Sequence, residues 1–283
     1  MTITGQALIA GVIGHPIAHS LSPCIHNYWL EQYHISGAYI PIEAKPEHLE
    51  QVVKGFAHMS NMRGMNVTIP HKESVMLFAH EIDSLAKRIG AANTLVFDNG
   101  KIRATNTDAY GFMAHLQSSV STQPWVGNKA VVIGAGGAAR AICVALQDAG
   151  VADIVLVNRT LANAEKIQMD LGEPITVAPW EQRHDLLSGA GLLVNTSSLG
   201  MQGKDPLDID IGALSATAIV YDIVYKPLET NLLKQARLRG NPVVDGLGML
   251  LHQAVGGFER WFGVKPEVTP QLRHNILQAA GLI

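Results

Sequence analysis

A chain of 283 residues with 47% hydrophobic and 16% charged residues has the length for two globular domains, each with its own core. A formal net charge of −3, without a cluster of Lys and Arg, argues against a nucleic-acid-binding surface. No uncharged apolar run reaches the roughly 18 residues of a membrane span, the N-terminus lacks the basic region of a signal peptide, and two cysteines make no disulfide framework. We expect a cytoplasmic protein that binds neither nucleic acid nor membranes.

The twelve histidines raise the question of a metal site. His15 and His19 come closest to the spacing of metal ligands, and Cys24 and His26 follow them. However, Pro16 places the pair in a turn rather than on one helix face, and no cluster completes four ligands. We therefore expect no metal here, only loop histidines near a polar site.

The first hundred residues alternate signals for strands and helices. Pro23 stands at the first position of an expected helix, with Ser22 as its N-cap. Asn99-Gly100 favours the positive-φ turn that joins two twisted strands into a hairpin. The expected strands cover 7–13, 38–44, 62–69, 93–97 and 101–105, and the expected helices cover 23–33, 46–58, 72–80 and 83–88. This part of the chain is an α/β domain without a glycine fingerprint.

After a further expected helix at 108–116, a strand, a glycine-dense turn, a helix and a second strand follow one another. The apolar run 129–133 enters Gly134-Ala-Gly-Gly-Ala138, and the second apolar run covers 153–157. Gly134 permits the tight turn, Gly136 lets backbone N–H groups approach a pyrophosphate, and Ala139 replaces the third glycine where the helix packs on the strand. The phosphates would lie at the helix N-terminus, whose free N–H groups favour anions. The pattern predicts a dinucleotide-binding unit.

The end of the second strand indicates which dinucleotide binds. A site for NAD usually places Asp or Glu there to accept a hydrogen bond from the ribose 2′-hydroxyl. This chain has the neutral Asn158, then Arg159 and Thr160. A guanidinium can bind a 2′-phosphate through paired charge-assisted hydrogen bonds, so we predict NADP(H). In the alternative interpretation Arg159 is a solvated loop charge and Thr160 only caps the next helix.

The rest of the chain continues the α/β alternation and then changes to helices alone. Expected strands at 192–195, 219–223 and 242–245 complete a mostly parallel, doubly wound Rossmann sheet. The expected helices 249–262 and 270–280 have no strand after them, and we expect them to pack back on the first domain. The predicted domains are therefore 1–107 with 247–283, and 108–246, with a cleft between them.

Polar clusters outside the dinucleotide unit carry a resemblance to a known family. They are Ser20-Leu-Ser22-Pro23, Asn66-Val-Thr68-Ile-Pro70-His71-Lys72, Asn93-Thr94 and Asn106-Thr107-Asp108. With Gly134-Ala-Gly-Gly-Ala, Asn158-Arg159-Thr160, Asn195-Thr196 and Gly246-Leu-Gly-Met249…Gln253, they occur in order over nearly the whole chain. In this set the chain resembles the shikimate dehydrogenases, which reduce 3-dehydroshikimate to shikimate with NADPH in aromatic amino-acid and chorismate biosynthesis.

The resemblance implies a role for each matching position. Lys72 and Asp108 would form the catalytic pair. The implied substrate-binding residues are Ser20, Ser22, Asn66, Thr68, Asn93, Asp108, Tyr225 and Gln253. The implied cofactor-binding residues are Gly134, Ala135, Gly136, Gly137, Ala138, Asn158, Arg159, Thr160, Thr196, Val224, Gly246 and Met249.

These residue types suit the reduction of a ketone on a hydroxylated ring acid. Asn, Thr, Gln and Asp can each hydrogen-bond ring hydroxyls, and buried polar partners reject analogues that lack them. The alkoxide formed on reduction needs a positive donor and a proton, which Lys72 can supply, and Asp108 would orient it. An opposite charge raises the pKa of a lysine and burial lowers it, so the protonation state of Lys72 stays open.

The chain departs from the family pattern in three places. Asn163 stands where many relatives have a second basic residue after Asn-Arg-Thr, with Lys166 one helical turn later. Ala92 replaces a bulkier valine before Asn93, and Ser84, next to Asp83, stands where some relatives have an acid. Three rival interpretations remain: a quinate/shikimate dehydrogenase that uses NAD or NADP, a non-catalytic relative that senses the metabolite, and an NADP-linked reductase that shares only the Rossmann half. The oligomeric state, monomer or homodimer, is open.

Overall fold

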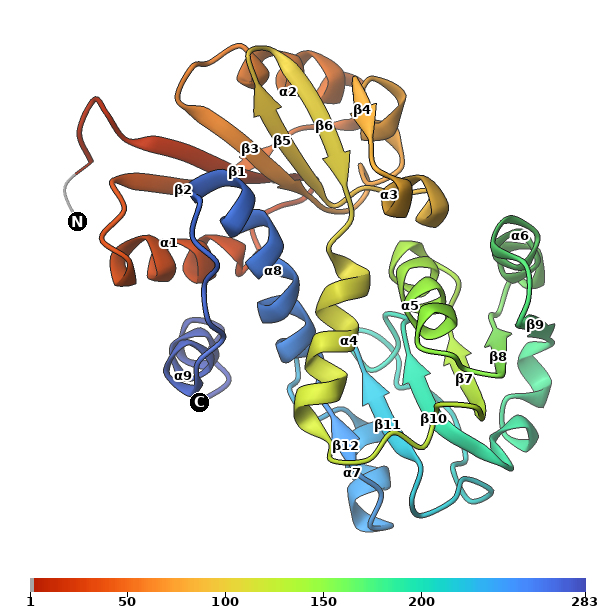
Figure 1. Cartoon of the computed structure of the whole chain (residues 1–283). Helices are drawn as coiled ribbons and strands as arrows, with labels where there is room; N and C mark the ends of the chain where they lie inside the picture. Colours follow the sequence, from red (N-terminus) through yellow and green to blue (C-terminus); the bar gives the residue numbers. More distant parts are fainter. Residues whose placement is uncertain (1–2) are drawn as a thin grey trace. The chain divides into compact units, whose positions relative to one another are not determined.

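Residues 3–283 are described by a computed structural model, in which the chain divides into two compact units (Figure 1). Unit 1 comprises Met1–Thr107 and Leu251–Ile283, and unit 2 comprises Asp108–Leu250. The second boundary falls at residue 250 rather than at the expected 246, inside the helix Gly246–Phe262 (α8). In the described part of the chain, each unit is built on one six-stranded sheet.

The sheet of unit 1 has a parallel half and an antiparallel half. Its strand order is β2-β1-β3-β5-β6-β4, with β1 parallel to β2 and β3 and with β5 antiparallel to β3 and β6. Asn99 and Gly100 have φ values of 49° and 81°, so the predicted hairpin turn is confirmed. The strands are β1 (Leu8–Gly14), β2 (Gly37–Glu43), β3 (Met62–Val67), β4 (Glu81–Ile82), β5 (Thr94–Asp98) and β6 (Lys101–Thr105).

The helices of unit 1 are α1 (Ser22–Gln32), α2 (Leu49–Ala57), α3 (Ser84–Ile89), the C-terminal part of α8, and α9 (Pro270–Ala279). The C-terminal segment packs on the N-terminal one, as expected. The indole Nε1 of Trp261 donates to Leu95 O at 2.9 Å, and that of Trp29 donates to Glu267 O at 3.1 Å. Gly64, at φ +152°, makes this packing possible, because a Cβ there would lie 2.3 Å from Nε1 of Trp261.

Unit 2 is a doubly wound parallel sheet, as predicted (Figure 1). In the strand order β12-β11-β10-β7-β8-β9, the chain first adds β8 and β9 on one side of β7 and then β10, β11 and β12 on the other side. Ligands bind in such sheets at this switch point, between β7 and β10. The elements are α4 (Asp108–Ser119), β7 (Lys129–Ile133), α5 (Gly137–Asp148), β8 (Asp153–Val157), α6 (Leu161–Leu171), β9 (Ile175–Ala178), β10 (Ala190–Asn195), β11 (Ile219–Asp222), α7 (Asn231–Leu238) and β12 (Val243–Val244), followed by the start of α8.

Three expectations about local structure are wrong. Residues 72–80 form only a single 3₁₀ turn, Ser74–Leu77, because Val75 alone is buried in that turn while Leu77 is 88% exposed, so no apolar stripe stabilises a helix. The segment 46–58 begins with a 3₁₀ turn, Pro46–His48, before α2. Ser22 is the first residue of α1 rather than its N-cap; instead the Ser20 hydroxyl accepts from the backbone N–H of Ser22 at 3.3 Å. Among the described residues, no helix has both the length and the apolar character needed to cross a membrane.

Candidate active site

The glycine-rich turn of unit 2 leaves the N-terminus of α5 open. Gly134 has φ +108°, and a Cβ there would lie 2.7 Å from Oγ1 of Thr196, so only glycine fits. Gly136 is the N-cap of α5 and provides no side-chain cap, and no described atom lies within 4 Å of a Cβ built at Gly136 or Gly137. The free N–H groups of a twelve-residue helix therefore face open space, an arrangement that suits a pyrophosphate.

The turn lies at the point where the strand order of the unit 2 sheet reverses. Thr196, directly after β10, donates from both its backbone N–H and its hydroxyl to Ile133 O, each at 2.8 Å. The backbone N–H of Gly134 donates to Val157 O at 2.8 Å. The carboxyl ends of β7, β8 and β10 are thereby tied together beside α5. This is the position in which doubly wound sheets bind dinucleotides.

The segment after β8 presents a cation without an acidic neighbour. Asn158 Nδ2 donates to Thr160 O at 2.8 Å and closes the turn. Thr160 is the N-cap position of α6, but its hydroxyl makes no capping hydrogen bond, so the capping interpretation of this residue is wrong. Arg159 is exposed and pairs with no described residue. The segment could therefore hold a phosphate without first breaking an ion pair.

A buried carboxylate that the sequence analysis overlooked holds the loop after β11. Asp222 is fully buried and accepts hydrogen bonds from Asn195 Nδ2 at 2.9 Å, Val224 N at 3.0 Å and Thr230 Oγ1 at 2.7 Å. Burial raises the pKa of Asp222 to about 6, although the three hydrogen bonds act against that shift. Asp222 positions Val224, and with it the neighbouring Tyr225. The available signal was an acid that ends a buried apolar strand.

The first turn of α8 packs closely within unit 2. A Cβ at Gly246 would lie 2.1 Å from Ile223 O, and one at Gly248 would lie 2.0 Å from Nε2 of His115. The other ring nitrogen of His115 hydrogen-bonds to the Tyr221 hydroxyl at 2.8 Å. The predicted cofactor residues Gly246 and Met249 are buried on this turn.

In unit 1 the predicted substrate residues follow β1 and β3. Strand order reverses at β1, so the loops after β1 and β3 meet at the carboxyl edge of the sheet. The backbone N–H of Thr68 donates to Ile13 O at 2.9 Å, and that of His15 donates to Ile69 O at 3.1 Å. Ser20 and Thr68 are half-buried in these loops.

A chain of buried amides and hydroxyls joins three of the predicted substrate residues. Asn66 Nδ2 donates to Thr94 Oγ1 at 3.1 Å, and Thr94 Oγ1 donates to Asn93 Oδ1 at 3.0 Å. Asn93 Nδ2 donates to Gln253 Oε1 at 3.2 Å, and Asn93 Oδ1 accepts from Thr107 N at 2.8 Å. Asn66 and Gln253 come from β3 and α8, so unit 1 brings together residues that are far apart in the chain.

The predicted catalytic residues belong to different units. Lys72 is half-buried beyond β3, and its carbonyl accepts from Ala92 N at 2.8 Å. The neighbouring His71 is buried and anchored by a hydrogen bond between Nε2 and Ala44 O at 2.8 Å. Asp108 is 6% exposed and opens α4. The pairing of Lys72 with Asp108 stays a prediction.

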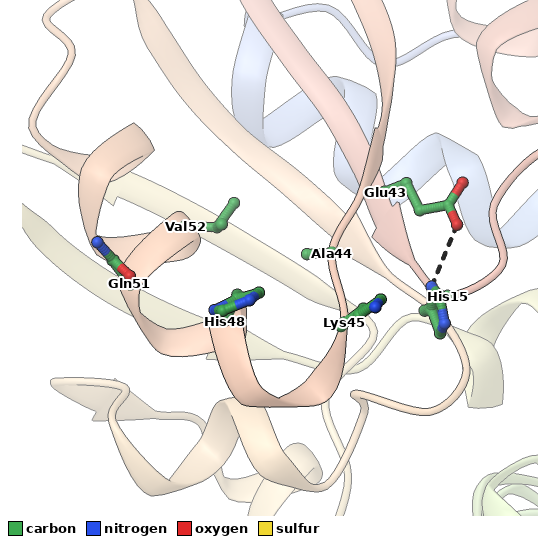
Figure 2. Close-up of a pocket in the computed structure, with 7 residues that line it drawn as sticks. All are labelled: His15, Glu43, Ala44, Lys45, His48, Gln51 and Val52. Atoms are coloured by element: carbon green, nitrogen blue, oxygen red, sulfur yellow. Dashed lines mark ion pairs between the residues drawn. The ribbon is translucent and has the colours of Figure 1, made fainter.

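Unit 1 also has a cavity that contains none of the predicted site residues. Its volume is about 600 Å³, and it lies beside the ends of β1 and β2 and the start of α2. Figure 2 shows the ion pair at its rim, in which His15 Nδ1 lies 3.1 Å from Glu43 Oε1. The described residues form no cluster of His, Cys, Asp or Glu able to hold a metal ion. The lining residues are His15, Glu43, Ala44, Lys45, His48, Gln51 and Val52.

Comparison with known protein families shows to which family the chain belongs. The shikimate dehydrogenase substrate binding domain matches residues 12–95, shikimate / quinate 5-dehydrogenase matches 117–200, and the shikimate 5′-dehydrogenase C-terminal domain matches 246–270. The chain belongs to the shikimate dehydrogenase family. Its matches extend through both units.

Relatives of the shikimate dehydrogenase family match the chain over nearly its full length. A shikimate dehydrogenase (NADP(+)) from Paramagnetospirillum magneticum is 52% identical over 97% of this chain and 100% of its own. Among solved structures, shikimate 5-dehydrogenase from Thermus thermophilus, in complex with NADP(H) and shikimate, is 32% identical with a TM-score of 0.85, covering 96% of this chain and 99% of that one. Quinate dehydrogenase from Corynebacterium glutamicum, in complex with NAD, is 27% identical with a TM-score of 0.88, covering 96% and 99%.

Proposed function

We propose that this protein is an NADP-dependent shikimate dehydrogenase that reduces 3-dehydroshikimate to shikimate in chorismate and aromatic amino-acid biosynthesis. The observation that carries the proposal is the 52% identity with a relative named shikimate dehydrogenase (NADP(+)), because it extends over 97% of this chain and so includes both units. Two free cysteines, Cys24 and Cys143, suit a reducing compartment, and we place the reaction in the cytoplasm. Light scattering would decide between a monomer and a homodimer, which the sequence leaves open.

The residues of unit 2 suit NADP(H). The open N-terminus of α5 would hold the pyrophosphate, and the exposed guanidinium of Arg159 would bind the 2′-phosphate. The neutral Asn158 adds no charge repulsion at that position. Thr196, Val224, Gly246 and Met249 would line the remainder of the cofactor site. Asp222 accepts from the backbone N–H of Val224, and the His115 ring lies against Gly248.

The residues of unit 1 suit a ring that carries hydroxyls and one carboxylate. The hydroxyls of Ser20 and Ser22, beside the N-terminus of α1, would bind the carboxylate. Thr68, Asn66, Asn93 and Gln253 would hydrogen-bond the ring hydroxyls. The amides of Asn66, Asn93 and Gln253 already hydrogen-bond within unit 1, which fixes their positions before the ring binds.

The chemistry assigned to Lys72 is charge stabilisation and proton donation. Bound NADPH supplies the hydride for the ketone. The ammonium of Lys72 would hydrogen-bond the substrate carbonyl oxygen, stabilise the negative charge that develops there and give it a proton. Asp108 would orient that ammonium and accept a hydrogen bond from the neighbouring ring hydroxyl. In shikimate oxidation Lys72 takes the proton back.

Quinate oxidation with NAD is the second candidate function, favoured by the likeness to the quinate dehydrogenase in complex with NAD. The segment Asn158-Arg159-Thr160 argues against the use of NAD, because an NAD site usually has an acid at this position. Initial rates with shikimate and quinate, each with NADP⁺ and NAD⁺, decide between the two. We expect the highest kcat/KM for shikimate with NADP⁺; a preference for quinate with NAD⁺, or no oxidation of shikimate, would overturn the proposal.

Replacing the predicted proton donor tests the mechanism. Lys72→Ala should lower kcat by about 10²–10⁴-fold, the range expected for general acid–base catalysis, and leave the dissociation constant of NADPH nearly unchanged. The matched control is Lys54→Ala, which removes a half-exposed lysine in an i,i+4 ion pair with Glu50 and should leave turnover unchanged. Wild-type turnover in Lys72→Ala would refute its catalytic role.

A further inference from the structure

A buried tyrosine lies beneath the substrate residues of unit 1 and belongs to none of the predicted site positions. Tyr39 is in β2, is 2% exposed, and donates from its hydroxyl to Asn66 Oδ1 at 2.6 Å. Asn66 is in β3, and β1 lies between these two strands. Tyr39 is in register with Ala10 and Asn66 with Val12, so the phenol reaches the amide diagonally across β1.

The phenol is held rigidly from several sides. The His26 ring stacks on it with centroids 4.1 Å apart and an interplanar angle of 8°, and the Trp261 ring lies 5.9 Å away. Asn27 binds the Tyr39 backbone on both sides, accepting from its N–H at 3.0 Å and donating to its carbonyl at 2.9 Å. Burial raises the pKa of Tyr39 well above its ordinary value, so the hydroxyl remains protonated and able to donate.

The Asn66 amide has a defined orientation because one of its partners can only accept a hydrogen bond. Asn93 O is a backbone carbonyl, so the amide nitrogen faces it, and Oδ1 is the atom that accepts from the Tyr39 hydroxyl. The amide NH₂ then points the other way, to Asn93 O at 3.2 Å and Thr94 Oγ1 at 3.1 Å. An exchange of oxygen and nitrogen would place Oδ1 against the carbonyl oxygen of Asn93, with which it cannot hydrogen-bond, and would take away the acceptor of the Tyr39 hydroxyl.

The influence of Tyr39 extends from Asn66 to Thr94. Since the Thr94 hydroxyl accepts from Asn66, its own hydrogen is available for Asn93 Oδ1 at 3.0 Å. The orientation of the Asn93 amide itself is fixed by the backbone N–H of Thr107, which donates to Oδ1 at 2.8 Å, so that the Asn93 NH₂ faces Gln253 Oε1 at 3.2 Å.

We propose that Tyr39 is a positioning residue of the substrate pocket, whose hydroxyl holds the amide of Asn66, and with it the Thr94 hydroxyl, in place for the substrate's ring hydroxyls. This inference rests on the proposed function. It assigns Tyr39 a part in substrate affinity and selectivity, without contact with the reacting atoms.

Two tyrosine-to-phenylalanine variants separate this role from a loss of stability. Tyr39→Phe keeps the stacked ring and removes the hydroxyl, and we expect the KM for shikimate to rise about tenfold, with kcat and the KM for NADP⁺ changed less than twofold. Tyr33→Phe is the matched control: its ring lies 6.2 Å from Phe258 in the same aromatic group, and its hydroxyl accepts from Glu267 N, outside the amide network. It should keep the wild-type KM.

The route through Asn66 can be tested by a double-mutant cycle. In an Asn66→Ala background, Tyr39→Phe should have no further effect on the KM for shikimate or on its dissociation constant measured by calorimetry. Thr94→Val, which removes the next hydroxyl of the network, is an independent variant with the same expected rise in KM. It keeps the proposal testable if Tyr39→Phe does not fold.

The outcomes distinguish this inference from the proposed function. If the wild type oxidises shikimate with NADP⁺ but Tyr39→Phe and Thr94→Val keep its KM, the positioning role is wrong and the proposed function stands. Equal rises in KM for Tyr39→Phe and Tyr33→Phe would also overturn it, because they would indicate a general loss of packing. A wild type that does not turn over shikimate overturns both.

Discussion

At the scale of single residues, the polar side chains of the candidate site differ in how much of their hydrogen bonding the protein already uses. Asn66 and Asn93 are 4% and 2% exposed, and each has both ends of its amide bonded. Ser20 and Thr68 are half-buried and more accessible. Buried amides cost free energy unless they are paired, so this network can be rigid before substrate arrives. Arg159 is the opposite case, an exposed cation without a described partner.

The role of Arg159 can be measured by nucleotide preference. Arg159→Ala removes the predicted charge-assisted hydrogen bonds to the 2′-phosphate, so the KM for NADPH should rise about 10–100-fold while the KM for NADH stays nearly constant. Arg237→Ala, which breaks an exposed ion pair with Glu229 in the same unit, should change neither KM. Unchanged discrimination between the two nucleotides in Arg159→Ala would refute the assignment.

At the scale of elements, the third residue of α8, Gly248, has no room for a side chain. Asp245 Oδ1 accepts from Leu247 N at 2.9 Å and satisfies one N–H of the first turn. The His115 ring occupies the position that a Cβ of Gly248 would take, and it is held there by the Tyr221 hydroxyl. Tyr221 in turn stacks on Phe112 of α4, with centroids 4.9 Å apart. α4, β11 and α8 therefore meet around the His115 ring, for which Gly248 leaves room.

Glycine-to-alanine substitutions in two helices should have opposite effects. Gly248→Ala should lower the free energy of unfolding by about 1–3 kcal/mol and weaken NADPH binding, because the new methyl group would overlap the His115 ring. Gly55→Ala, in α2, has no described atom within 4 Å of its Cβ and should raise stability by about 0.5–1 kcal/mol through helix propensity. Chemical denaturation measures both. A stabilised Gly248→Ala variant would show that α8 shifts freely here.

At the scale of the whole molecule, each unit contains a buried titratable group with a shifted pKa, and acid changes the stability contributed by these two groups in opposite senses. His26 in unit 1 is fully buried, and neither ring nitrogen hydrogen-bonds to a described residue. Burial lowers the pKa of His26 from 6.5 to about 3, with the Asn66 side chain acting against that shift. In unit 2, burial raises the pKa of Asp222 from 3.8 to about 6. The two groups make the stability of the units depend on pH with opposite sign.

The sign for His26 follows from which state binds the proton. Between pH 6.5 and 3 the unfolded chain protonates this imidazole and the folded chain does not, so stability falls as the pH falls through that window. Between pH 7 and pH 4, His26 alone lowers the free energy of unfolding by about 3 kcal/mol. For Asp222 the folded state holds the extra proton between pH 3.8 and 6, so its contribution is present at low pH and is lost as the pH rises.

Removing the imidazole should reduce the acid sensitivity of the protein. His26→Phe keeps a ring against Tyr39, and the drop in unfolding free energy from pH 7 to pH 4 should be about 3 kcal/mol smaller than in the wild type. Asp222→Asn should make this drop larger than in the wild type, because it deletes a group that favours the folded state at low pH. Urea titrations at the two pH values measure these differences. Equal drops in wild type and His26→Phe would contradict the neutral, buried state of His26.

The sequence by itself determined the features whose cause lies within about a dozen neighbouring residues. The turn from β7 into α5, the hairpin at Asn99-Gly100 and the parallel order of unit 2 follow from local apolar runs and from glycine's access to positive φ, and the structure confirms them. Asn158 and Arg159 likewise carried the prediction of the nucleotide without any knowledge of packing.

Tertiary structure alone decided which polar groups face one another. Nothing near Tyr39 in the chain indicates Asn66, nor does anything near Gly64 indicate Trp261, because such contacts join strands and helices far apart in sequence and leave no periodic pattern. Two wrong expectations have the same origin. The local pattern assigned Ser22 as an N-cap, whereas Ser22 is the first residue of α1. It also assigned a helix to residues 72–80, whose Leu77 is exposed in the fold and cannot stabilise one. Local propensity specifies elements; burial and hydrogen-bond pairing across the fold specify how the amides of the site are turned.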